Sequence, residues 1–189
     1  NFFSLSNKNN EQFTSFVEII KEWTVSVNLI GIPGGDISKN ISQLEYILEE
    51  CLSFNIDRNS LIIAFGGGVI GDIAGFAASI LLRGLDFIQI PTTLLAQVDS
   101  SVGGKTGINS SKSKNLIGSF HQPIAVIADI DMLKTLPKRE FLAGLVEVIK
   151  YGLIYDFKFF QALENNFKDI LEYDQLKLNE IISRSCEIK

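Results

Sequence analysis

The chain has 189 residues, enough for one large domain or for one and a half ordinary ones. Its hydrophobic fraction of 46% is typical of a globular protein, and no apolar run reaches the roughly eighteen residues of a membrane span. The net charge of −5 argues against nucleic-acid binding, which needs a basic face. Two cysteines, Cys51 and Cys186, form no disulfide framework and indicate a cytoplasmic protein. A start at Asn1 rather than Met indicates a piece of a longer protein, and N-terminal processing is the alternative.

Helical and strand patterns alternate through the first two thirds of the chain. Apolar spacing predicts helices at 10–22, 41–54 and 70–82, and strands at 25–32, 61–65, 87–90 and 124–129. A further short helix is expected from Thr93 to Val98. Because strands that alternate with helices form parallel sheets, this order predicts a doubly wound, mostly parallel, Rossmann-like α/β fold.

Only helical patterns follow Pro137, at 140–155, 157–164 and 175–189. This change predicts a partial NAD-binding α/β domain at 1–137 and the beginning of an all-helical, metal-binding domain at 138–189. The last helix has no C-terminal cap, which again indicates truncation. We therefore expect the apolar side chains of Phe141 and Leu145 to be partly uncovered and prone to association.

The segment Gly66-Gly67-Gly68-Val69-Ile70-Gly71 fits the pattern G-x-G-x-x-G between a strand and a helix. Such glycines permit a tight turn and let backbone N–H groups approach a pyrophosphate at the positive helix terminus. A purely structural turn is an equal alternative, because the motif by itself is weakly specific. The acidic residue expected on the next strand is not evident, which argues against an ordinary Rossmann dehydrogenase. Asp72 falls in the first turn of the predicted helix, where it favours the helix dipole or serves only as a cap.

A stretch without acidic residues runs from Ser100 to Ala128 and contains Lys105, Lys112 and Lys114. In an acidic protein this composition favours an anion site, although a solvated loop is the alternative. Thr93 is either a helix N-cap or a residue of a ligand site at the carboxyl end of a parallel strand.

Glu147 and Lys150 lie three residues apart on the predicted helix 140–155, on the face opposite its apolar residues. On sequence alone a solvated ion pair is the favoured interpretation, and a metal ligand is the alternative for Glu147. The one histidine, His121, is more typical of a packing or surface residue. A site that needs two histidines cannot be completed within these residues.

Taken in order, these segments resemble the 3-dehydroquinate synthase family. The matching motifs are GGGVIGD at 66–72, RG at 83–84, PTTLLAQVDSSVGGKTGIN at 91–109, KNLIG at 114–118, QP at 122–123, TLPKRE at 135–140, AG at 143–144 and EVIKYG at 147–152. The segment at 34–39 is similar to the family's nucleotide loop, with Asp36 where the family commonly has Glu. Ser113 stands where a glycine usually precedes Lys114 and Asn115.

The resemblance implies an NAD site, a substrate site and a homodimer. Asp99, Lys105, Asn115 and Lys150 would face the substrate, and Arg83 would reach the phosphate in a neighbouring subunit's site. The residues implied to contact the cofactor are Gly34, Gly35, Asp36, Ile37, Ser38, Lys39, Gly68, Val69, Ile70, Gly71, Asp72, Thr92, Thr93, Lys105, Lys114, Met132, Leu133, Lys134 and Thr135.

The implied activity is a phosphate-eliminating cyclase of the shikimate pathway. It would convert 3-deoxy-D-arabino-heptulosonate 7-phosphate to 3-dehydroquinate and phosphate, through transient oxidation by NAD and an internal aldol closure. A divalent metal, zinc or alternatively cobalt, would polarise the substrate. Glu147 would be one of three metal ligands, and the other two would be histidines beyond Lys189.

Three other functions stay open on sequence. They are another sugar phosphate cyclase with the same cofactor, a metal-dependent alcohol dehydrogenase that releases reduced NAD, and a nucleotide-binding remnant without catalysis. We expect residues 1–189 by themselves to be inactive, because the metal histidines are missing. No nucleic-acid or membrane partner is expected.

Overall fold

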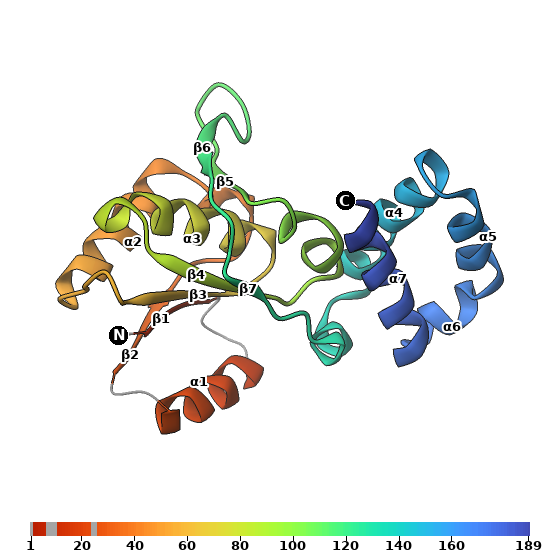
Figure 1. The fold of residues 1–189 in the computed structure, drawn as a ribbon, viewed down its shortest axis with the longest axis horizontal. Helices are drawn as coiled ribbons and strands as arrows, with labels where there is room; N and C mark the ends of the chain where they lie inside the picture. Colours follow the sequence, from red (N-terminus) through yellow and green to blue (C-terminus); the bar gives the residue numbers. More distant parts are fainter. Residues whose placement is uncertain (1, 7–10, 24–25) are drawn as a thin grey trace.

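A five-stranded parallel sheet organises the first two thirds of the chain (Figure 1). The computed structural model describes residues 2–6, 11–23 and 26–189. The strand order is β2–β1–β3–β4–β7, and every neighbouring pair is parallel. The strands are β1 (Phe2–Ser6), β2 (Val27–Gly31), β3 (Leu61–Gly66), β4 (Asp86–Pro91) and β7 (Ala125–Val126).

Helices cover both faces of this sheet, which confirms the predicted doubly wound α/β fold. Helix α1 (Glu11–Trp23) lies on one face, and α2 (Ile41–Ser53) and α3 (Gly68–Ile80) lie on the other (Figure 1). The short 3₁₀ turn η1 (Asp36–Ser38) connects β2 to α2. Asn40 caps α2, because its side chain accepts a hydrogen bond from the backbone N–H of Gln43 at 2.9 Å.

Burial on both faces explains why β3 is apolar along its whole length. Alternate side chains of a strand point to opposite faces of the sheet. Ile62 and Ala64 are buried in the cluster formed with α2 and α3, whereas Ile63 and Phe65 pack with Ile90 on the other face. A parallel strand covered in this way needs apolar residues at consecutive positions.

Four strands in the first part of the chain differ from the prediction. Strand β1 was not predicted, and neither was the antiparallel hairpin of β5 (Lys105–Ile108) and β6 (Ile117–Phe120). Each strand of the hairpin has only four residues, one of them glycine, and a loop rich in serine and lysine joins the two, so the apolar pattern is too short to be recognised. Strand β7 is shorter than the strand predicted at 124–129.

Helix α3 begins at Gly68 and ends at Ile80, instead of spanning 70–82. It ends early because Leu82, Arg83 and Gly84 have φ angles of 49°, 72° and 122°, and left-handed backbone cannot continue a helix. The earlier start puts Asp72 beyond the first turn, so the prediction that it lies in that turn is wrong.

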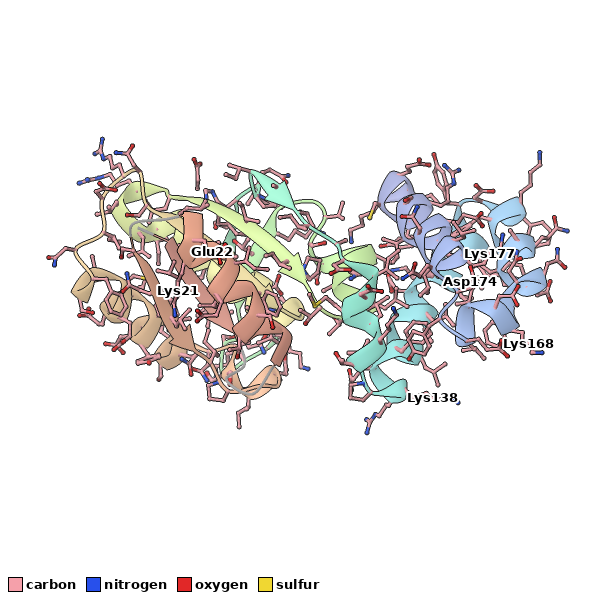
Figure 2. All side chains as sticks on the ribbon, turned by 90° about the horizontal axis from the view of Figure 1, so that it is seen from below. Lys21, Glu22, Lys138, Lys168, Asp174 and Lys177 are labelled. Atoms are coloured by element: carbon pink, nitrogen blue, oxygen red, sulfur yellow. The ribbon has the colours of Figure 1, made fainter. Side chains whose placement is uncertain are left out.

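Four helices follow residue 137: α4 (Lys138–Ile154), α5 (Phe157–Asn165), α6 (Phe167–Leu171) and α7 (Gln175–Ile188). Only α6 was absent from the sequence prediction. Asp156 and Asp174 cap α5 and α7 by accepting backbone hydrogen bonds at 3.1 and 2.9 Å. Figure 2 shows Lys138 and Lys168 at the periphery of this helical part, with Lys21 at the other end of the molecule. The division into two domains at Pro137 stays a prediction.

The expectation that Phe141 and Leu145 are partly uncovered is wrong. They are 1% and 2% exposed, because they pack in one cluster with Leu94, Val98 and Leu133 from the preceding part of the chain. The large apolar side chains exposed on α4 and after it are others, namely Leu142, Val146, Leu153, Ile154, Tyr155, Phe157, Phe167 and Leu176. Among the residues that the structure describes, no helix is long and apolar enough to cross a membrane.

Candidate functional site

The carboxyl ends of the parallel strands meet at one edge of the sheet. Strands β3 and β4 are in register so that Gly66 lies beside Pro91, and the backbone N–H of Thr92 donates to the carbonyl of Gly66 at 3.0 Å. The glycine turn after β3 and the segment after β4 are therefore adjacent. Open parallel sheets bind their ligands at this edge.

Close packing at the start of α3 favours glycine. A Cβ atom on Gly68 would lie 2.7 Å from Oγ of Ser100, and one on Gly67 would lie 3.1 Å from Cγ2 of Thr93. Thr93 also acts as a cap, since its Oγ1 accepts a hydrogen bond from the backbone N–H of Ala96 at 3.2 Å. Gly67, the N-cap of α3, has no side chain to bond the first N–H groups of the helix. Those groups and the positive end of the helix dipole suit an anionic ligand.

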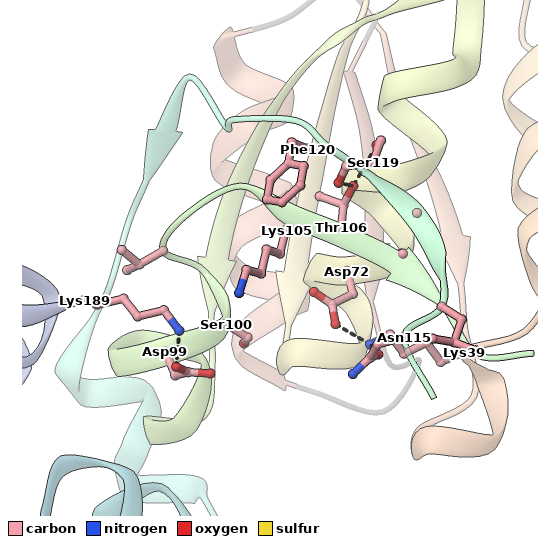
Figure 3. Close-up of a pocket in the computed structure, with 14 residues that line it drawn as sticks. Lys39, Asp72, Asp99, Ser100, Lys105, Thr106, Asn115, Ser119, Phe120 and Lys189 are labelled. Carbon is pink, nitrogen blue, oxygen red and sulfur yellow. Dashed lines mark hydrogen bonds and ion pairs between the residues drawn. The ribbon is translucent and has the colours of Figure 1, made fainter. Parts of the chain in front are cut away.

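A cavity of about 390 Å³ opens beside the first turns of α3 (Figure 3). It brings together five of the predicted site residues, Lys39, Asp72, Asp99, Lys105 and Asn115. Its other lining residues are Ser100, Val102, Thr106, Gly107, Leu116, Gly118, Ser119, Phe120 and Lys189. Charged groups of both signs in one cleft suit a polar ligand that carries an anionic group.

Lys39 is the centre of a charge network on one side of the cavity. It is 6% exposed, forms an ion pair with Asp72 and donates a hydrogen bond to Oδ1 of Asn115. A buried ammonium group needs such partners. Burial raises the pKa of Asp72, and the hydrogen bond and charge of Lys39 only partly oppose this. Asn115 has a left-handed φ of 57°, which asparagine tolerates better than most residues.

Asp99 lies on the other side of the cavity, in the π-helical turn η3 (Ala96–Ser100). Its Oδ1 accepts a hydrogen bond from the hydroxyl of Tyr151 at 2.8 Å and forms an ion pair with Lys189. Burial raises the pKa of Asp99, but the hydrogen bonds from Lys189 and Tyr151, together with the charges of Lys189 and Lys150, outweigh it, so the pKa is lowered. Asp99 is therefore a carboxylate at neutral pH.

The amine of Lys105 points toward Ser100 and the Asp99–Lys189 pair (Figure 3). The hairpin β5–β6 sets this position, with Gly107 directly opposite Gly118. A side chain at Gly118 would overlap the carbonyl oxygen of Thr106, so the two strands approach as closely as glycine allows. Among the described residues, Lys105 has no ion-pair partner.

A more exposed ion pair joins η1 to the β5–β6 loop outside the cavity. Lys114 lies 2.8 Å from Asp36, and this hydrogen bond lowers the pKa of the carboxyl. Ser113, where the family usually has glycine, is not among the described residues with positive φ. The position therefore does not need glycine here. Ser110 holds the turn instead, since its Oγ accepts the backbone N–H groups of Lys112 and Ser113, both at 3.1 Å.

The other residues predicted to bind the cofactor do not line the cavity. Met132, in the 3₁₀ segment η4 (Ile130–Thr135), packs against the cluster of Ile63, while Leu133 is 0% exposed. Lys134 pairs with Asp131 at 2.7 Å. The remaining predicted positions lie on the exposed loop before η1 (Gly34 and Gly35), in η1 (Ile37, exposed, and Ser38, buried), in the first turns of α3 (Val69, Ile70 and Gly71) and after β4 (Thr92).

Glu147 and Lys150 also lie outside the cavity. They form an ion pair along α4, in which the Glu147 side chain is 18% exposed and the Lys150 side chain 50%. This agrees with the ion pair favoured on sequence alone, although Glu147 is more buried than a solvated residue. The described part of the chain contains no group of three or more His, Cys, Asp or Glu residues that could hold a metal ion.

Two further predicted positions are resolved by their surroundings. His121 is a packing residue, because its ring stacks on Phe87 with a centroid distance of 5.3 Å and its Nε2 is hydrogen-bonded to the carbonyl of Leu85 at 2.8 Å. Arg83 is exposed on the left-handed turn after α3 and forms no ion pair with any residue that the structure describes.

Three residues of the site were not predicted from the sequence. Tyr151 directly follows Lys150 in the matched motif, and Ser100 directly follows Asp99, so their place beside predicted site residues was the available signal. Lys189 carries no local signal. The Oγ of Ser100 is buried and has no hydrogen-bond partner among the described residues, which leaves it free for a ligand.

The matching family models and the curated relatives that resemble this chain carry the same family description. Residues 29–143 match the family model described as 3-dehydroquinate synthase N-terminal. Residues 144–189 match the model described as 3-dehydroquinate synthase C-terminal. The curated 3-dehydroquinate synthase of Thermoanaerobacter pseudethanolicus is 51% identical over 177 residues, which are 94% of this chain and 50% of that protein. The chain thus spans about half the length of the curated relatives it matches.

Solved structures of similar fold include two sugar phosphate cyclases. A 2-epi-5-epi-valiolone synthase from Streptomyces hygroscopicus, with NAD+ and Zn2+ bound, superposes with a TM-score of 0.92 at 26% identity, over 100% of this chain and 53% of that one. A 2-deoxy-scyllo-inosose synthase, complexed with carbaglucose-6-phosphate, NAD+ and Co2+, gives a TM-score of 0.76 at 30% identity, over 81% of this chain and 43% of that one.

Proposed function

Because the chain belongs to the 3-dehydroquinate synthase family, we propose that it forms the NAD-binding part of an enzyme that converts 3-deoxy-D-arabino-heptulosonate 7-phosphate to 3-dehydroquinate and phosphate. The observation that supports this most directly is the cavity beside α3. It brings Lys39 and Asp72, proposed to contact the cofactor, to the same space as Asp99, Lys105 and Asn115, proposed to contact the substrate.

The start of α3 fits a dinucleotide. Gly67 and Gly68 leave no side chain over the first helical N–H groups, so a pyrophosphate could approach the backbone and the positive helix end. The two solved cyclases with NAD+ support the same cofactor here. When bound, NAD supplies a hydride acceptor that gives the hydride back within the same turnover.

The cavity residues have separate proposed roles toward the substrate. Lys105 neutralises an anionic group of the sugar phosphate, because its amine is the cation without an ion-pair partner among the described residues. Asp99, ionised at neutral pH, accepts a hydrogen bond from a substrate hydroxyl. Asn115, held by Lys39, orients a second polar group, and Lys150 is the fourth proposed contact.

Glu147 is the one metal ligand that we propose in this chain. Its carboxylate suits zinc or cobalt, the ions named for the two solved cyclases. A complete metal site does not fit the described residues, which offer no cluster of further donors. The other ligands would come from outside them.

Arg83 supports the proposal of a homodimer. Its guanidinium is exposed on a left-handed turn, and no described residue neutralises it. An exposed arginine without an ion-pair partner among the described residues is suited to bind the phosphate in a neighbouring subunit's site. The cytoplasmic location stays a prediction.

An assay of the complete gene product tests the proposed function. Incubation with NAD, zinc and the seven-carbon sugar phosphate should release phosphate and 3-dehydroquinate in equal amounts, with no accumulation of reduced NAD. An alcohol dehydrogenase would accumulate reduced NAD, and another cyclase would release phosphate only from a different sugar phosphate. Absence of 3-dehydroquinate from an NAD-loaded, metal-loaded protein would contradict the proposal.

A further inference from the structure

The two oxygens of Asp99 have different surroundings. Oδ1 accepts the hydrogen bond from Tyr151 and also pairs with Lys189. Oδ2 accepts no hydrogen bond from the described residues, although Asp99 lines the cavity. A carboxylate fixed through one oxygen presents the other in a defined direction.

Tyr151 is itself rigidly held. It is 5% exposed and belongs to the same apolar cluster as Val98, the residue before Asp99. Its helix, α4, lies directly on the segment that leads into η3, since a Cβ atom on Gly144 would be 2.6 Å from the backbone N of Leu95. The hydroxyl is the polar tip of an otherwise apolar side chain, and such a buried hydroxyl has to find a partner.

We propose that Tyr151 is a positioning residue of the active site, whose hydroxyl fixes the Asp99 carboxylate so that Oδ2 faces the ligand. This inference rests on the proposed function and deepens it, because it concerns the same cavity. Tyr151 does not line the cavity, so it acts through Asp99. The contact also connects α4, which carries Glu147 and Lys150, to the carboxylate in the α/β part of the chain.

The charges around Asp99 define what the hydroxyl contributes. Lys189, the C-cap of α7, and Lys150 on α4 favour the carboxylate, whereas Asp72 on α3 disfavours it. Lys105 on β5 lines the same cavity. Against burial, which raises the pKa of Asp99, the hydrogen bond from Tyr151 lowers it. Loss of the hydroxyl should therefore raise this pKa toward its ordinary value. Activity that needs the carboxylate would then be lost at a higher pH on the acid side.

The test uses Tyr151→Phe in the complete gene product, with Tyr155→Phe as control. Phenylalanine fills the same buried space, while Tyr155 is an exposed tyrosine at the C-cap of the same helix. We expect Tyr151→Phe to lower kcat by about tenfold to a hundredfold, the effect of a lost hydrogen bond to a charged group, and to leave the KM for NAD within about threefold. The acid limb of its pH profile should move to higher pH. Tyr155→Phe should match the wild type in all three.

A second variant guards against a loss of activity that comes from misfolding. If Tyr151 acts through Asp99, then adding Tyr151→Phe to Asp99→Asn should reduce the residual rate no further. Two fully additive losses would overturn the inference, as would a folded Tyr151→Phe with wild-type kcat and pH profile. The pKa of Asp99, measured by carbon-13 NMR, separates the two proposals. A wild type without cyclase activity refutes the proposed function, whereas an Asp99 pKa that Tyr151→Phe leaves unchanged refutes the role of Tyr151.

Discussion

At the scale of single residues, Lys105 is the cation of the cavity to which the described residues offer no ion-pair partner, whereas Lys39 pairs with Asp72 and Lys189 with Asp99. Lys105→Met keeps most of the side-chain volume and removes the charge. We expect turnover in the complete enzyme to fall by about a hundredfold or more, as for loss of a positioned electrostatic group. Steady-state kinetics with the sugar phosphate provide the measurement.

Lys112 offers the matched control for this substitution. It is exposed in the β5–β6 loop and does not line the cavity, so Lys112→Met should keep turnover within about twofold of the wild type. Equal turnover of the wild type and Lys105→Met would contradict the proposal that the β5–β6 hairpin contributes to the site.

Glu147 has two possible roles that a single pair of variants distinguishes. As a surface ion pair with Lys150, it should contribute well under about 1 kcal/mol to the free energy of unfolding, and Glu147→Gln should leave the metal content unchanged. If Glu147 is a metal ligand, the Glu147→Gln protein should lose most of its bound zinc. We expect the second result, with Lys150→Gln retaining its zinc. Elemental analysis of both full-length variants is the measurement. Equal zinc content in the two would contradict the assignment of Glu147 as a metal ligand.

At the scale of elements, the contact between α4 and the segment after β4 depends on Gly144. Alanine is the better helix former by about 1 kcal/mol, yet its Cβ atom would lie 2.6 Å from the backbone N of Leu95 and 2.8 Å from Cβ of Leu94. Backbone cannot yield as a flexible side chain does, and overpacking costs about 1–3 kcal/mol. We therefore expect Gly144→Ala to lower the free energy of unfolding in the complete protein, measured by denaturant titration.

Val146→Ala is the control on the same helix. Val146 is 65% exposed, so this change should be nearly neutral or slightly stabilising. A Gly144→Ala protein as stable as the wild type would mean that α4 can move away from Leu94 and Leu95. In that case Tyr151 could not be held in place by this contact.

At the scale of the whole molecule, we expect residues 1–189 by themselves to show no cyclase activity and no stoichiometric zinc. The described residues contain no cluster that could hold a metal ion, and one proposed ligand cannot retain zinc. Weak NAD binding through the turn at 66–72 is the most that we expect. Metal analysis, calorimetry with NAD and the cyclase assay test these points, and conversion of the sugar phosphate by residues 1–189 would contradict them.

The sequence by itself determined the type and order of most elements, because burial leaves a periodic trace. The continuous apolar run of β3 and the spacing of Phe141, Leu145 and Val148 on α4 each reflect the face that packs. The same signal failed at the β5–β6 hairpin, whose strands of four residues are too short to show a period and each contain a glycine. Periodicity marked the buried face of α4, but it did not show that residues such as Leu94, Leu133 and Tyr173 cover that face within this chain. The motifs between Gly66 and Gly152 were sufficient to predict the family.

Only the tertiary structure decided which of the motif residues meet. Lys39 contacts Asp72 and Asn115 across 33 and 76 positions of the chain, and Asp99 contacts Tyr151 across 52. Periodicity specifies an element and its buried face, but it contains no information about which loops approach one another at the edge of a sheet. That approach follows from how α3, the β5–β6 hairpin and α4 pack, so the partners of the two cavity carboxylates could be found only in the folded chain.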